Sequence, residues 1–85
     1  MKVRIDIDGK RQKLDLARVH YINELERGEK VVTRHPDTRE LCIAVVSFDM
    51  YGHLWLTDSV RELAPYRWMV SKRNVYGEVY KINPV

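Results

Sequence analysis

The chain has 85 residues, of which 45% are apolar and 32% are charged, and its formal net charge is +3. This balance excludes an intrinsically disordered chain, and the length supports one modest hydrophobic core, so we expect a single domain over residues 1–85. The only cysteine excludes an internal disulfide framework and a zinc site with two cysteine ligands. The first residues alternate in charge and lack a long apolar stretch, so we expect a cytoplasmic protein that does not enter membranes.

Residues 2–14 are expected to form a β-hairpin. Charged and apolar residues alternate from Lys2 to Asp8, which is the period of a strand with one buried face. The dipeptide Asp8-Gly9 follows, and both residue types accept the positive φ angles of a two-residue turn. The register predicted from this turn places Ile7 opposite Lys10, Asp6 opposite Arg11 and Val3 opposite Leu14.

The segment from Asp15 to Arg27 is predicted to be an amphipathic helix. At helical spacing one broad arc collects the apolar residues, which are Ala17, Val19, Tyr21, Ile22 and Leu25. Asp15 can accept hydrogen bonds from the first free amides, and Gly28 supplies a left-handed residue after the last turn.

Three strands are predicted next, at Lys30–Arg34, Leu41–Phe48 and His53–Thr57. The turns His35-Pro36-Asp37-Thr38 and Asp49-Met50-Tyr51-Gly52 would join them into an antiparallel meander. Because Leu41–Phe48 is apolar on both faces, we expect it to be a central strand.

The remaining chain is expected to close the sheet. A short helical turn is predicted near residues 59–64, because Pro65 stops it. Residues 67–71 and 76–82 are predicted to pair as a final hairpin. The fold class we expect is therefore α+β: a mostly antiparallel sheet, either open or curled into a small SH3-like barrel, with one helix at about 15–27.

The residues that could ligate metals or act as nucleophiles are poorly arranged in the sequence. His20, His35 and His53 stand apart, without the His-x₃-His or Cys-x₂-Cys spacing that prepares a metal site, so no metal and no cofactor are expected. Cys42 has apolar neighbours and no adjoining basic residue to favour the thiolate, so we expect a small core residue.

Catalytic patterns are equally weak, and we assign no catalytic residue. Pro36-Asp37 lies between two predicted strands, but no acidic residue beyond it has a lysine two positions later to help hold a metal ion and polarise water. The remaining catalytic alternative is a small metal-independent ribonuclease in which His35 or His53 acts as the general base. An enzyme is the less favoured interpretation.

The second half of the chain is rich in the residue types that dominate protein interfaces. The candidate residues for binding a protein partner are Tyr51, Trp55, Tyr66, Arg67 and Trp68. The leading interpretation is a non-enzymatic binding or regulatory protein that engages another protein, in the manner of the inhibitors and accessory proteins with which phages and mobile elements modulate host nucleic-acid machinery. A homodimer is left open, since an exposed strand edge can pair with its own copy.

Direct nucleic-acid binding is the first alternative. Basic residues gather on the first hairpin and in the predicted last turn, and aromatic residues flank the second group, as in proteins that bind single strands. The residues predicted for this role are Lys10, Arg11, Lys13, Lys72, Arg73 and Tyr76. Asp6 and Asp8 beside the first group would repel phosphates, which favours the protein partner.

Overall fold

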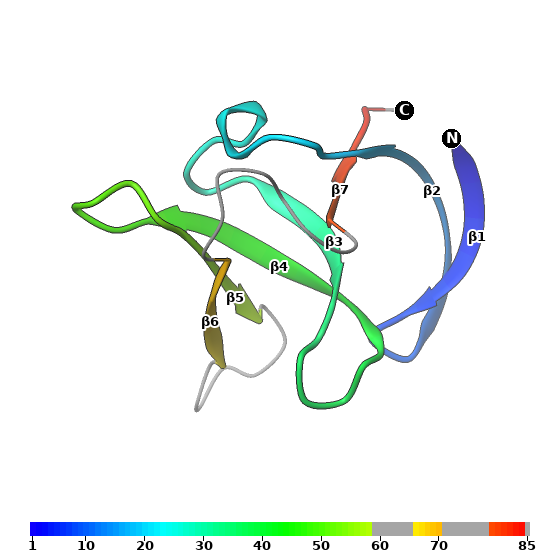
Figure 1. Cartoon of the computed structure of the whole chain (residues 1–85). Helices are drawn as coiled ribbons and strands as arrows, with labels where there is room; N and C mark the ends of the chain where they lie inside the picture. The colour runs from blue at the N-terminus through cyan, green and yellow to red at the C-terminus, as the bar shows by residue number, and fades with distance from the viewer. Residues whose placement is uncertain (59–65, 71–78, 85) are drawn as a thin grey trace.

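The computed structural model describes residues 1–58, 66–70 and 79–84. Within these ranges the chain forms one curved antiparallel sheet with the strand order β1-β2-β7-β3-β4-β5-β6 (Figure 1). The strands are β1 (Lys2–Ile7), β2 (Lys10–Arg18), β3 (Lys30–Arg34), β4 (Leu41–Phe48), β5 (Leu54–Asp58), β6 (Arg67–Val70) and β7 (Val79–Ile82). Among the described residues, β1 and β6 stand at the two ends of this order, and no strand pairing joins them.

The structure contradicts the predicted α+β class. Of the described residues, 61% lie in strands and 4% in a single 3₁₀ turn, η1 (Ile22–Glu24). The first part of the predicted helix at 15–27 is extended, because Leu16, Ala17 and Arg18 pair with β7. A backbone that donates and accepts across the sheet cannot also form helical hydrogen bonds, so the pairing with β7 decides the conformation.

The two residues predicted to bound the helix have other roles. Asp15 accepts a 2.8 Å bond from the amino group of Met1, which ties the start of β1 to β2. Gly28 adopts the expected positive φ of 85°, but it precedes β3, and its N–H donates to Val46 O at 2.8 Å. Both residues therefore support the sheet.

The first hairpin is confirmed in every predicted pair. Ile7 lies opposite Lys10, Asp6 opposite Arg11 and Val3 opposite Leu14. Asp8 and Gly9 have φ angles of 53° and 77°, as a two-residue turn of this type requires.

The meander of β3, β4 and β5 is also confirmed, with β4 between its two sequence neighbours. The predicted closing hairpin is wrong: β6 pairs with β5 at the end of the sheet, whereas β7 lies between β2 and β3. The helical turn predicted near 59–64 lies outside the described residues. No helix within the described ranges is long and apolar enough to cross a membrane.

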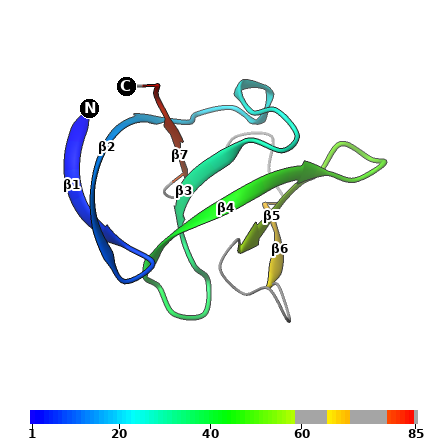
Figure 2. The same cartoon turned by 180° about the vertical axis from the view of Figure 1, so that it is seen from behind.

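The core lies on both faces of the central strands. In β3, Val31 points to one apolar cluster and Val32 to the other, as alternation along a strand requires. The first cluster lies between the curved strands β3 to β6 and the segment around Val19 and Leu25. The second is enclosed by the β1–β2 hairpin, which arches over the beginning of β4 (Figures 1 and 2).

Candidate binding site on the outer face of the sheet

The β1–β2 hairpin covers only part of the sheet face that carries Val32. The same face continues across β4, β5 and β6, where the strand register aligns two rows of side chains. One row is Lys30, Val45, Thr57 and Arg67, and the other is Ser47, Trp55 and Met69. Lys30, Arg67 and Met69 are exposed here, so this half of the face is open to solvent.

Trp55 is the centre of this open area and is held from two sides. The guanidinium carbon of Arg67 lies 4.4 Å from the centroid of the indole, which is the geometry of a cation–π contact. The indole Nε1–H donates to Asp49 Oδ2 at 3.1 Å. An indole fixed in this way presents a rigid, half-buried surface, since both its position and its tilt are set.

Asp49 also shapes the turn between β4 and β5. Its Oδ1 accepts hydrogen bonds from the backbone N–H groups of Tyr51 and His53, both at 2.9 Å, and Oδ2 lies 3.2 Å from His53 Nδ1. Burial raises the pKa of Asp49, but the Trp55, His53 and Tyr51 donors outweigh it and lower the pKa to about 2.

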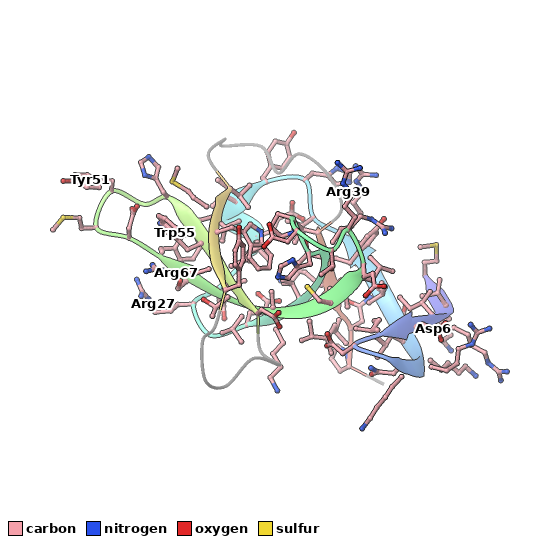
Figure 3. All side chains as sticks on the ribbon, turned by 90° about the horizontal axis from the view of Figure 1, so that it is seen from below. Asp6, Arg27, Arg39, Tyr51, Trp55 and Arg67 are labelled. Atoms are coloured by element: carbon pink, nitrogen blue, oxygen red, sulfur yellow. The ribbon has the colours of Figure 1, made fainter. Side chains whose placement is uncertain are left out.

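This turn projects Met50 and Tyr51 into solvent. They are 87% and 78% exposed, and Met69 on β6 is 43% exposed. Large apolar side chains at such exposure are informative when they gather in one place. We define the outer patch as Met50, Tyr51, Trp55, Arg67 and Met69. Figure 3 shows Tyr51, Trp55 and Arg67 on one side of the molecule.

The five residues predicted to bind a protein do not share one face. Tyr51, Trp55 and Arg67 belong to the outer patch, whereas Tyr66 and Trp68 are half-buried and pack against the His35 ring. The ring centroids of Tyr66 and Trp68 lie 5.0 Å and 5.3 Å from that of His35. These residues lie on two faces because successive side chains of β6 point to opposite sides of the sheet. Met69 lies on the same face as Arg67 and belongs to the outer patch, although the sequence analysis did not predict it.

His35 is 3% exposed and organises the turn between β3 and β4. Its Nδ1 accepts hydrogen bonds from the N–H groups of Asp37 at 3.1 Å and Thr38 at 3.4 Å. Its Nε2 lies 3.6 Å from Asp58 Oδ2, and Asp58 is 6% exposed. Beside this pair is a cavity of about 150 Å³, which we call the His35 hollow, lined among others by Asp8, Thr38 and Glu40.

The catalytic alternative finds little geometric support here. His35 already uses Nδ1 as an acceptor, and Nε2 is buried, so neither nitrogen is placed to take a proton from a bound substrate. His53 lies beyond the other end of β4, an eight-residue strand that spans roughly 25 Å. The two candidate bases therefore lie at opposite ends of β4 and would belong to separate sites.

Cys42 is confirmed as a core residue. It is 5% exposed, and burial raises its pKa to about 11, with Asp58 and Asp8 adding to the effect. Such a thiol stays protonated at neutral pH, as expected of a small core residue. Within the described ranges, no three His, Cys, Asp or Glu side chains converge to hold a metal ion.

The basic residues of the nucleic-acid alternative are described only in part. Lys10, Arg11 and Lys13 are exposed on the first hairpin, and Arg11 Nη1 lies 3.5 Å from Asp6 Oδ1. Lys72, Arg73 and Tyr76 lie outside the described residues. In Figure 3 Asp6 lies on the opposite side of the molecule from Trp55, so this hairpin and the outer patch are separate surfaces.

Comparison with known proteins gives no relative: no family model, no curated protein and no solved structure matches this chain.

Proposed function

We propose that this chain is a non-enzymatic protein-binding module, acting in a reducing compartment such as the cytoplasm, and that the outer patch is its binding surface. The observation that carries the proposal is the Arg67–Trp55 stack on an open sheet face, with the exposed Met69 opposite Trp55. Asp49 connects the stack to the turn that exposes Met50 and Tyr51. Aromatic, methionine and arginine side chains are enriched at interface cores, where they bury large contact areas.

The charges around the patch favour an acidic segment of the partner. Lys30 and Arg67 stand on the open face. Both oxygens of the Asp49 carboxylate are engaged within its own turn and by Trp55, so they are not available as acceptors for the partner. A stacked guanidinium keeps its outer N–H groups available for a carboxylate.

The same geometry disfavours base stacking at this face. The Arg67 guanidinium lies over one side of the Trp55 ring, whereas a base would have to occupy such a side to stack. A protein surface can instead contact the outer side of the guanidinium and the Met69 side chain. We therefore favour a protein partner over a nucleic acid at the outer patch.

The test compares charge reversals on the two separate surfaces. Arg67→Glu alters the outer patch, and Lys13→Glu is a matched control on the exposed first hairpin. We expect a partner that is captured from lysate by the wild-type protein, and then purified, to bind Lys13→Glu normally and to bind Arg67→Glu at least about tenfold more weakly.

Two results would contradict the proposal. Equal binding of the purified partner to wild type and Arg67→Glu removes the outer patch from the interface. Capture that is abolished by nuclease treatment, together with oligonucleotide binding that is lost in Lys13→Glu, supports the nucleic-acid alternative instead.

A further inference from the structure

The outer edge of β1, which we call the β1 edge, is a second candidate interaction surface. β1 pairs with β2 on one side, and among residues 1–58, 66–70 and 79–84 no strand pairs with its other side. Figures 1 and 2 both show β1 as the outermost strand on the side of the molecule away from the turn between β4 and β5. The unpaired edge of a strand carries backbone donors and acceptors that another strand can use.

The hydrogen bonds between β1 and β2 show which backbone groups point to the β1 edge. The amino group of Met1 donates to Leu16 O, and the N–H of Leu16 donates to Met1 O, both at 2.8 Å. Because bonded and non-bonded pairs alternate along antiparallel strands, the odd-numbered residues of β1 also direct their backbone groups at β2. The N–H and C=O groups of Lys2, Arg4 and Asp6 therefore point to the β1 edge.

The side chains of β1 separate into an apolar face and a charged face. Val3 and Ile5 are half-buried and pack against the second core cluster, whereas Arg4 and Asp6 are exposed on the other face. Arg4 lies directly opposite Lys13 of β2, and like charges in such a pair are destabilising. The cross-strand neighbour of Arg4 within the hairpin is therefore a cation, so a carboxylate on its other side would stabilise it.

A second copy of this chain supplies that carboxylate. We propose that the β1 edge pairs with the β1 edge of a second copy, antiparallel and with Ile5 on the twofold axis, to form a symmetric dimer. In this register Arg4 of each copy lies opposite Asp6 of the other, and both residues direct their backbone groups at the edge, so each such pair exchanges two backbone hydrogen bonds. On the apolar face Ile5 meets Ile5 and Val3 meets Ile7, which continues the second core cluster from one copy into the next.

Charge selects this register over its neighbours. A slip of one residue would set apolar side chains against charged ones, because it exchanges the two faces of the strand. A slip of two residues in one direction would place Arg4 opposite Arg4, and in the other direction Asp6 opposite Asp6. The register with Ile5 on the axis avoids both repulsions and gives opposite charges at each Arg4–Asp6 pair.

This pairing leaves the outer patch uncovered. In Figure 3 Asp6 lies at the opposite margin of the molecule from Tyr51, Trp55 and Arg67. A dimer joined at the β1 edge therefore presents one outer patch on each copy. The inference goes beyond the proposed function and does not depend on it.

The oligomeric state at rising protein concentration tests the proposal. One pair of short strands is a small interface, so we expect a weak dimer with a dissociation constant of about 0.1–1 mM. Sedimentation equilibrium should show the mass rising toward that of a dimer. The ¹⁵N NMR signals of the Arg4 and Asp6 amides should shift with concentration, and that of Ile5 should shift less because it already bonds to β2.

Two results of this series would overturn the proposal. A protein that is still monomeric at about 1 mM does not pair with itself, and the β1 edge would then be left to an extended segment of a different protein. A dimer that forms without any shift of the Arg4 and Asp6 amides is joined through another surface.

Charge exchange tests the register. Arg4→Glu sets two carboxylates opposite each other in the dimer, and Asp6→Lys sets two cations opposite each other, so each variant alone should dimerise about tenfold more weakly or worse. Mixed in equal amounts, the two variants should associate at least as well as the wild type, because both pairs between the unlike copies then join opposite charges. Asp6→Lys also loses the exposed contact with Arg11, which contributes little stability, so the hairpin should persist.

Two further variants are matched controls for the change in net charge. Lys10→Glu and Glu26→Lys alter the charge as Arg4→Glu and Asp6→Lys do, but at exposed residues away from the β1 edge, and both should dimerise as the wild type does. Variants Arg4→Glu and Asp6→Lys that dimerise normally when alone, or a mixture of the two that stays monomeric while both are folded by their ¹⁵N spectra, contradict the proposed register.

Discussion

The two faces of β5 and β6 use the same short strands for different purposes. On the inner face, Leu54 and Leu56 are fully buried and pack with Trp68 in the core. On the outer face, one residue away along each strand, Trp55 and Arg67 stack in contact with solvent. Composition alone therefore does not show whether an aromatic residue of a strand stabilises the core or is available for binding. The face of the sheet to which its side chain points decides this, and that face alternates from one residue to the next.

The largest expected effect comes from truncating the inner face. Leu56→Ala should lower the free energy of unfolding by about 2–5 kcal/mol, because Leu56 is fully buried and a cavity remains. Its neighbour Thr57 faces outward, so Thr57→Ala should cost no more than about 1 kcal/mol. Urea denaturation measures both values, and equal losses would show that the two faces do not differ.

A smaller effect is expected at His35, whose acceptor nitrogen organises a turn on the inner side. His35→Ala should cost about 1–3 kcal/mol, because the amides of Asp37 and Thr38 lose their shared acceptor. His35→Asn places a carbonyl oxygen near the position of Nδ1 and should recover part of the loss. If thermal or urea unfolding shows the two variants to be equally destabilised, the ring contacts with Tyr66 and Trp68 matter and the hydrogen bonds do not.

On the outer face, Arg67→Ala should have only a slight effect on stability. Losing an exposed cation–π contact costs about 0.5–1 kcal/mol, so the urea midpoint should move little even though partner binding is lost. Arg67→Lys keeps the charge but not the planar stack, so it separates the two contributions to binding. A loss of stability comparable to that of Leu56→Ala would mean that Arg67 is part of the structural core.

The smallest expected change in overall stability comes from protonating Asp49. Its pKa falls from the ordinary 3.8 to about 2 in the folded chain, so its ionised form favours folding. That contribution is fully present above the ordinary pKa and is lost as the pH falls toward about 2. Carbon NMR of the Asp49 carboxyl should show this low midpoint, accompanied by a shift of the Trp55 Nε1–H signal; an ordinary midpoint would show that Asp49 does not hold the indole.

Local sequence information was sufficient for the first hairpin and the central meander. The alternation in β1 and the positive φ angles accepted by Asp8 and Gly9 fix that hairpin register without distant contacts. The segment from Leu14 to Leu25 carries two overlapping periods: Leu14 and Leu16 alternate as in a strand, whereas Val19, Ile22 and Leu25 are spaced as in a helix. The start of this segment is a strand because it pairs with β7, and β7 is too distant in the sequence to be read from the local pattern.

The candidate site was predictable to a similar extent. In a strand, residues two positions apart share a face. Applied from Arg67, this rule would have placed Met69 in the outer patch, and Tyr66 and Trp68 on the inner face. The burial of His35 and its approach to Asp58 were not predictable, because they depend on how Tyr66, Trp68 and the tip of the first hairpin meet around one turn.

The position of β7 between β2 and β3 has a consequence for biosynthesis. When a ribosome has made the chain as far as β5, the β1–β2 hairpin and the β3–β5 meander can each form, but no sheet hydrogen bonds join the two. The strand that joins them, β7, follows the other described strands in the chain, and its partners Leu16 and Val31 lie far back in the sequence. Until β7 has been translated, the nascent chain therefore carries two unpaired inner strand edges, which chaperones can protect from wrong pairing.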